Sequence, residues 1–462
     1  MALFYRLRSA RKAIDEIKEE YFFFSSPENL NDPMEWYVNL FWCGDVVVWK
    51  NLFRHYLLCI DFAMIQPHLD LHYSVEEIVL TIHSIANLPG RRDFITGVID
   101  RIFGDADITS FIESISSRKA KIYDDELGFY LDIFNYYAIG ELVKYYNNEN
   151  GDIISEDIFV ENFKEAYKYL KEHEYFCNIN KYSTDCTPTE ESIRMIFMLR
   201  LAFRNHLTQS TYSEICNPSS LGINMLNFSS CYIKAMKRLL FPKWSVVSFM
   251  KEISNPMVWG HYGDGHRGVC LIFESQHTES IEYLRVWKPS SYSGGEYHYD
   301  YIKSELRDVE YVEKLPEIDF FSNIGMIPTP QLMDNWYTFK EERSRFADKI
   351  SGMNRENRNK DQRNAFERKT LSKLKAWDYE KESRLIYDDL FKPIKEDERK
   401  IKFDNSQLKG VIFGFDTAIV DKVNIRKIIN DKNKSENGIS IDIYQAYYDH
   451  KSSSIKYFKL PA

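Results

Sequence analysis

The stretch that most constrains the fold is Lys243–Ser275, which reads KWSVVSFMKEISNPMVWGHYGDGHRGVCLIFES. It holds two short apolar runs rich in β-forming residues, Trp244–Met250 and Gly268–Glu274, which suit buried strands. Between them, Asn255-Pro256 is a turn signal that can open a helix over Met257–Tyr262, and the glycines that follow break it. The sequence therefore predicts a strand–helix–loop–strand unit with polar side chains in its connection, where sites tend to be built.

Length and composition limit the classes of protein to consider. A chain of 462 residues predicts two to three domains, and an aromatic content of 15% is typical of a globular core. A net charge of −9 argues against nucleic-acid binding by the whole surface. Seven scattered cysteines without zinc spacing indicate a reduced, cytoplasmic setting. No secretory signal or membrane-spanning stretch is expected.

The chain divides into three parts by pattern. Residues 1–36 and 241–462 carry strand patterns, whereas residues 37–240 are helical almost throughout. Residues 340–375 form a long charged helical segment within the last part. We therefore expect an α+β fold, with a mixed or antiparallel β core interrupted by a large inserted all-α domain.

The same patterns predict individual elements. Helices are expected at 9–20, 46–66, 75–88, 91–103, 107–117, 124–147, 157–173, 190–205, 229–240, 334–375 (with a break at Gly352) and 417–430. Further strands are expected at 3–7, 21–24, 282–287, 309–312, 384–387, 410–415, 439–448 and 455–460.

Three segments resemble a bacterial family known as domain of unknown function 2971. NPMVWGHYGDGHRGVCLIFE is similar to its central pattern N-P-x-x-W-x-H-Y-x-x-x-H-x-G-V-C. YFFFSSPENLNDPMEW resembles its strand followed by S-x-P-x-x-x-N-D-P-x-E, and KAWDYEKESRLIY resembles its W-x-Y-E-x-E-x-R segment. The resemblance covers the first 36 residues and about the last 220, and the family name implies no activity.

The Glu380-Lys381-Glu382 segment resembles, more weakly, the E-x-E element of mono-ADP-ribosyltransferases. Carboxylates at i and i+2 entering a strand share a face, and crowding of like charges raises at least one pKa. The resemblance implies that Glu382 holds the nicotinamide ribose of NAD while Glu380 positions the acceptor. It also implies that Arg6 binds a phosphate and that Ser25 belongs to the serine motif, although Phe24-Ser25-Ser26 departs from that motif.

Arg384 is a further candidate for contact with such a substrate. The alternative is structural: the two glutamates lie at a solvated strand edge, or Glu382 forms an ion pair with Arg384 or Arg343.

The central motif supplies the remaining candidates for this reaction. Trp259 and Tyr262 could stack on a nicotinamide or nucleobase, and His261 could act as an acid or base. The alternative is that Trp259 and Tyr262 are core aromatic residues with satisfied polar tips and that His261 bonds the backbone.

A metal site is the second hypothesis. Asp32 and Glu35 could bind Mg²⁺ or Mn²⁺, and with His261 and Glu382 they would form a metal-dependent nuclease or phosphodiesterase. The alternative is that Asn31-Asp32-Pro33 is an ordinary turn and cap.

The leading interpretation is an NAD-consuming enzyme, either an ADP-ribosyltransferase or an NAD glycohydrolase, acting in phage defence or as an intracellular toxin. A third hypothesis is a non-catalytic sensor that binds a protein or nucleic acid through the helical domain or residues 340–375. The absence of phosphate-loop and GxSxG motifs argues against nucleoside triphosphate hydrolysis and serine-hydrolase chemistry. The oligomeric state is left open.

Overall fold

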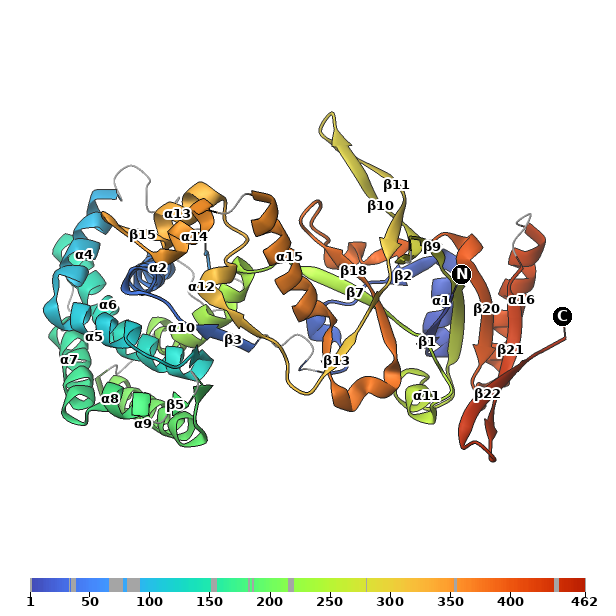
Figure 1. Cartoon of the computed structure of the whole chain (residues 1–462), viewed down its shortest axis with the longest axis horizontal. Coiled ribbons are helices and arrows are strands. Elements are labelled where there is room, and N and C mark those ends of the chain that lie inside the picture. The colour runs from blue at the N-terminus through green and yellow to red at the C-terminus, as the bar shows by residue number, and fades with distance from the viewer. Residues whose placement is uncertain are drawn as a thin grey trace. The chain divides into compact units, whose positions relative to one another are not determined.

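A computed structural model describes most of the chain (Figure 1). The described residues are 2–32, 34, 39–65, 78–80, 92–150, 156–181, 183–184, 187–214, 220–279, 281–352, 355–435 and 440–461. The chain folds into two compact units. The first, here called the sheet unit, comprises Met1–Val38, Pro242–Pro316 and Glu367–Ala462, and the second, the helical unit, comprises Asn39–Phe241 and Glu317–Phe366.

An eight-stranded mixed sheet forms the centre of the sheet unit. Its order is β12 (Arg307–Asp308), β18 (Glu382–Asp388), β7 (Trp244–Met250), β1 (Leu3–Arg8), β8 (Val269–Glu274), β20 (Leu408–Phe413), β21 (Asp442–Asp449) and β22 (Ser454–Lys459). Neighbours pair antiparallel except β20 and β21, which are parallel. This arrangement confirms the predicted α+β class.

The two faces of this sheet are covered by different helices. On one face, α1 (Ala10–Glu19) and α16 (Ile419–Ser435) pack on a core that includes Phe4 and Phe273. On the other, α11 (Pro256–Tyr262) packs on a core that includes Leu7 and Cys270. Because directly opposed residues of antiparallel strands share a face, the pairs Phe4↔Phe273 and Leu7↔Cys270 assign alternate residues of β1 and β8 to the two cores.

A long hairpin extends from the sheet unit (Figure 1). It consists of β10 (Ile281–Ser293) and β11 (Glu296–Glu305), and β9 (Gln276–Thr278) pairs with β10. Only the strand at 282–287 was predicted, because the rest of the hairpin is mostly exposed and lacks the apolar alternation of a half-buried strand. The remaining short strands and 3-10 turns of the sheet unit are β2 (Tyr21–Phe23), β13 (Glu310–Val312), β17 (Ser372–Leu374), β19 (Lys400–Lys402), η1 (Pro27–Asn29), η5 (Lys375–Glu380), η6 (Glu396–Glu398) and η7 (Asn405–Gln407).

The second unit is mainly helical, with short strand pairs. Its helices are α2 (Val46–Ile65), α4 (Arg92–Gly104), α5 (Ala106–Ser116), α6 (Asp124–Asn150), α7 (Glu156–Glu172), α8 (Tyr175–Lys181), α9 (Glu190–Glu214), α10 (Ser220–Met236), η4 (Lys237–Leu239), α12 (Phe320–Asn323), α13 (Thr329–Trp336), α14 (Arg345–Gly352) and most of α15 (Arg355–Leu371). Its strands are β3 (Asn39–Trp42), β4 (Ile122–Tyr123), β5 (Ser183–Thr184), β6 (Thr187–Pro188), β14 (Glu317–Asp319), β15 (Thr338–Phe339) and β16 (Glu342–Arg343). Among the helices that the structure describes, none combines the length and the apolar character needed to cross a membrane.

Residues 317–366 lie in the helical unit, although their place in the sequence groups them with the β core. Two long-range interactions hold them there. Strand β14 pairs in parallel with β3, and the side-chain amide of Asn51 on α2 donates to the carbonyl oxygens of Trp336 (2.9 Å) and Thr338 (3.1 Å). The predicted helical stretch over 334–375 is wrong as far as its first part is concerned, because the chain forms α13, the β15–β16 hairpin, α14, α15 and β17, but the expected break at Gly352 coincides with the end of α14.

The helical unit also contains a fully buried histidine. The Nδ1 of His55 is 2.7 Å from the Tyr232 hydroxyl, and its Nε2 is 2.8 Å from the carbonyl oxygen of Leu80. Burial lowers the pKa of His55 to about 4.

The predicted helix at 75–88 falls almost entirely outside the described residues.

Candidate active site

Two of the motif segments meet at one hydrogen bond in the sheet unit. Asn255 caps α11 by accepting from the amide of Met257 (2.9 Å), and Pro256 follows at the first helical position. The helix ends at Tyr262, whose hydroxyl donates to Glu380 Oε1 at 2.5 Å. The helix predicted between the two strands therefore brings Tyr262 of the central motif into a hydrogen bond with Glu380 of the W-x-Y-E-x-E segment.

The two glutamates of the E-x-E element converge on one lysine. Glu380 ends η5, Glu382 begins β18, and Lys381 between them has a left-handed backbone with φ 46°. Lys373 Nζ lies 2.6 Å from Glu380 Oε2 and 3.5 Å from Glu382 Oε2. The predicted common orientation is present, but a turn rather than a continuous strand produces it.

Glu382 has further partners. Arg384 donates to its two carboxylate oxygens from Nε (2.7 Å) and Nη2 (2.9 Å), a bidentate pair. The backbone amide of Glu382 donates to the Tyr311 hydroxyl at 2.8 Å. We call Tyr262, Tyr311, Lys373, Glu380, Glu382 and Arg384 the carboxylate cluster.

The environments of the two carboxylates push their pKa values in opposite directions. Burial is the largest influence on Glu380 and raises its pKa, against the opposing effect of Lys373. Burial would also raise the pKa of Glu382, but Arg384 and Lys373 together outweigh it and hold that pKa at about 2. A carboxylate pair with separated pKa values can divide into one group that exchanges a proton and one that stays ionised.

Aromatic side chains lie beside the cluster. The Trp377 ring centroid is 4.8 Å from Lys373 Nζ. The exposed His261 ring lies 6.1 Å from Trp377 and 6.2 Å from Tyr379, edge-on to both. His261 is therefore at the surface next to the cluster rather than in contact with the carboxylates.

Two other candidates are buried away from any ligand surface. Trp259 has no exposed area, and its indole nitrogen donates to the carbonyl oxygen of Ile253 at 2.8 Å, as in the core alternative. Arg6 pairs with Glu16 at 3.1 Å, and its register partner Leu271 belongs to the core beneath α1. Because the register partner of Glu382, Met250, belongs to the opposite core, Arg6 and the cluster lie on opposite faces of the sheet.

Ser25 lies farther along the same sheet. It forms an isolated bridge with Val246, four residues along β7 from Met250, the residue opposite Glu382. That separation corresponds to roughly 13 Å along a strand.

The N-D-P segment forms a turn. Asp32 accepts from the amide of Met34 at 2.8 Å, as expected of a turn or cap, and Glu35 lies outside the described residues. Within the described part of the chain, no group of three or more His, Cys, Asp or Glu side chains is arranged to hold a metal ion.

The family comparison covers the whole cluster. Residues 258–385 match the model described as "Protein of unknown function (DUF2971)". This segment belongs to the DUF2971 family. All six residues of the carboxylate cluster lie inside the matched DUF2971 segment, whereas the N-D-P motif lies outside it. No curated protein and no solved structure matches the chain.

Sequence reasoning missed two members of the cluster. Lys373 was counted with the basic helical segment, and Tyr311 was assigned only to a short strand. Both lie on neighbouring parallel strands, β13 and β17, where Tyr311 is the register partner of Lys373. The local sequence does not separate Lys373 from Lys375, which lies nearer to the W-x-Y-E-x-E segment and forms an exposed ion pair with Glu313.

Proposed function

We propose that the carboxylate cluster is the active site of an NAD-consuming enzyme, which cleaves the N-glycosidic bond of NAD or transfers its ADP-ribose. The observation that carries the proposal is the pair Glu380 and Glu382 of one motif segment, which Tyr262 of the central motif contacts and whose pKa values are displaced in opposite directions. Enzymes that cleave a glycosidic bond through an oxocarbenium-like transition state generally use two carboxylates with different roles.

The roles follow from the two environments. Glu382, kept ionised by Arg384, stabilises the positive charge that develops on the ribose as nicotinamide leaves with the bonding electron pair. Water or another acceptor then bonds to the ribose carbon, and its proton passes to Glu380, whose raised pKa brings it closer to neutral pH. Tyr262 and Lys373 orient Glu380 through their hydrogen bonds. Arg6 has no part in this proposal because it lies on the other face of the sheet.

The test is release of nicotinamide from NAD by the purified full chain, measured by chromatography with and without EDTA. Glu380→Gln and Glu382→Gln should each lower the rate by about 10²- to 10⁴-fold, and EDTA should have no effect. The matched control is Glu126→Gln in the helical unit, because Glu126 is also buried and accepts from Arg118 at 2.6 and 3.1 Å. The control variant should keep wild-type activity.

The proposal fails if the folded wild-type protein neither binds NAD in calorimetry nor releases nicotinamide. It also fails if Glu380→Gln retains full activity.

The burial of the carboxylates favours a second candidate, a non-catalytic partner-binding protein. Glu380 has no exposed area, and Glu382 is 4% exposed, with hydrogen bonds to both of its oxygens. In that case the cluster only stabilises the sheet unit. Glu380→Gln and Glu382→Gln would then lower the thermal stability of the protein, and the wild-type protein would neither bind NAD nor consume it.

A further inference from the structure

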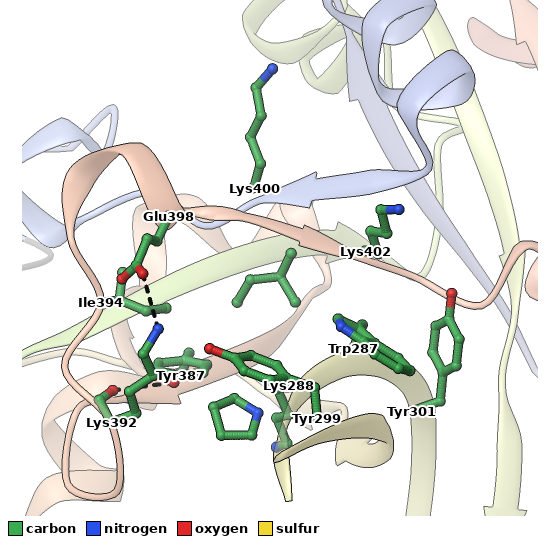
Figure 2. Close-up of a pocket in the computed structure, with 12 residues that line it drawn as sticks. Trp287, Lys288, Tyr299, Tyr301, Tyr387, Lys392, Ile394, Glu398, Lys400 and Lys402 are labelled. Carbon is green, nitrogen blue, oxygen red and sulfur yellow. Dashed lines mark hydrogen bonds and ion pairs between the residues drawn. The ribbon is translucent and has the colours of Figure 1, made fainter. Parts of the chain in front are cut away.

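A concave site lies in the sheet unit, between the β10–β11 hairpin and the chain that follows β18 (Figure 2). Its volume is about 520 Å³, within the range of small-ligand sites. It is lined chiefly by aromatic and lysine side chains. These are Trp287, Tyr299, Tyr301, Tyr387, Lys288, Lys392, Lys400 and Lys402.

The aromatic residues form a row on one face of the hairpin. Tyr299 and Tyr301 alternate along β11, and Tyr301 is the register partner of Trp287. The extra residue of a β-bulge between Pro289 and Ser291 brings Tyr292, the partner of Tyr297, onto the same face. Without that bulge, Tyr292 would point to the opposite face from Trp287.

The ring geometry suits a planar ligand. The Trp287 and Tyr299 rings are nearly parallel, at 16°, with centroids 6.5 Å apart. A third ring inserted between two others needs roughly 7 Å, twice the carbon–carbon contact distance, so a planar ligand stacks on these rings rather than between them. Trp287 is 41% exposed and Tyr299 39% exposed, so solvent reaches both rings.

Positive charges flank the row. Lys392 Nζ lies 5.6 Å from the Tyr299 ring centroid and 6.0 Å from that of Tyr297, and it pairs with Glu398 at 3.0 Å. Figure 2 shows Lys402 above Trp287 and Tyr301, whereas Lys400 extends away from the rings. Lys402 is exposed, and the Lys392–Glu398 pair lies close enough to the surface for a phosphate to compete with the glutamate.

We propose that this aromatic row binds single-stranded nucleic acid. Bases stack on Trp287 and Tyr299, and the backbone phosphates meet Lys392 and Lys402. Aromatic platforms beside basic side chains are the general means of holding a single strand without sequence preference.

The length of the row favours a polymer over a free nucleotide. Tyr301 and Tyr297, the ends of the row on β11, are four residue positions apart, roughly 13 Å. Tyr292, which is 57% exposed, and Phe391, 5.7 Å from the Tyr297 ring, continue the aromatic surface beyond the pocket. A single nucleotide would leave most of these rings uncovered.

This site is separate from the carboxylate cluster. Tyr387, which lines the pocket, packs against the core beneath α1 and α16, whereas Glu382 faces the other side of the sheet. The two residues are also five positions apart on β18, roughly 16 Å. The proposed binding of single-stranded nucleic acid therefore does not depend on whether the carboxylate cluster consumes NAD.

The experiment measures fluorescence anisotropy of a labelled single-stranded oligothymidylate with the full chain at low salt. The double variant Trp287→Ala/Tyr299→Ala should bind at least about tenfold more weakly, since one lost base stack costs roughly 5- to 150-fold. The matched control is Tyr447→Ala/Phe458→Ala, which removes another exposed aromatic pair of the sheet unit, with centroids 5.9 Å apart. It should bind within about twofold of wild type, because a surface substitution away from the site changes little.

Three further measurements test the same proposal. Lys402→Gln should reduce the slope of log K against log salt concentration by about 0.7, the value for one phosphate of a single strand. AMP and NAD, added as competitors, should displace the oligonucleotide only at far higher nucleotide concentration. Circular dichroism spectra of all variants should match the wild type, since the altered side chains are exposed.

Three outcomes would overturn the proposal. One is no binding of the oligonucleotide by the wild type, and another is equal weakening in the Tyr447→Ala/Phe458→Ala control. The third is displacement by AMP or NAD as effective as by the oligonucleotide, which would make the pocket a site for a free nucleotide.

Discussion

Replacing Lys373 by methionine keeps much of the side-chain volume but removes the positive charge between two buried carboxylates. Lys373 is 2% exposed, and its Nζ contacts Glu380 at 2.6 Å and Glu382 at 3.5 Å. In the Lys373→Met variant, Arg384 still neutralises Glu382, whereas Glu380 keeps only the Tyr262 hydroxyl. Glu380 must then take up a proton or remain an uncompensated buried charge.

The expected cost follows from this geometry. Removing one partner of a buried ion pair lowers the free energy of unfolding by about 3–5 kcal/mol. The double variant Lys373→Met/Glu380→Gln removes both charges, so it should be more stable than the sum of the single effects by about 1–3 kcal/mol. The surface control Lys251→Met breaks a pair with Asp308 whose side chains are 46% and 62% exposed, and it should cost less than about 1 kcal/mol.

Because the chain has two compact units, a local probe is preferable to a global melting curve. Hydrogen exchange measured by mass spectrometry on peptides that contain β18 reports the opening free energy of the strand next to the cluster. Faster exchange in Lys373→Met, partly restored in the double variant, is the expected result. Equal exchange in Lys373→Met and Lys251→Met, or a double variant as destabilised as the sum, would refute the reasoning.

Three further predictions concern pH and packing. The pKa of Glu382 falls from 4.5 to about 2 on folding, so its contribution to the free energy of unfolding is present above pH 4.5 and is lost as the pH falls toward 2. Glu382→Gln should remove on the order of 3 kcal/mol of this acid sensitivity, as measured by urea unfolding at a series of pH values. The unfolded state binds the His55 proton more tightly, since the pKa of His55 is 6.5 there and about 4 in the folded state. The free energy of unfolding of the helical unit should therefore fall by on the order of 3 kcal/mol as the pH falls from 6.5 to 4. In His55→Gln, hydrogen exchange should show a weaker dependence of this free energy on pH. In Gly268→Ala the new Cβ would lie 2.2 Å from the carbonyl oxygen of Arg8, so thermal unfolding should show a stability lower by about 1–3 kcal/mol or more. Gly260→Ala is the control: its Cβ would meet open space on α11, so its stability should rise by about 0.5–1 kcal/mol.

Local patterns predicted the elements that build the site. The strand at Trp244–Met250 is confirmed at both ends, and the cap at Asn255 and the helix ending at Tyr262 are confirmed as well. Each depends on interactions within a few residues: apolar β-forming runs, a side chain that caps the first turn, and proline at the first helical position. Such short-range preferences are legible in the sequence because they do not require knowledge of distant neighbours.

The partners of each charged side chain required the tertiary structure. Arg6 lies on the first strand, as the transferase resemblance requires, yet strand register turns it toward α1 and Glu16. Lys373 lies in a stretch rich in basic residues, yet a parallel pairing with β13 buries it between two carboxylates. One position along a strand reverses the face of a side chain, and ion pairs between distant segments leave no local pattern.

The sequence by itself therefore determined the fold class and the family of residues 258–385, and it predicted the shared orientation of Glu380 and Glu382, both of which contact Lys373. The tertiary structure alone decided that residues 317–366 join the helical unit and that a β-bulge aligns the aromatic residues of the hairpin on one face. The physical reason is the range of the interactions. Helices, turns and buried strands depend on nearby residues, whereas sheet partners, the face of each strand and the ligand-sized hollow between them depend on how distant segments pack.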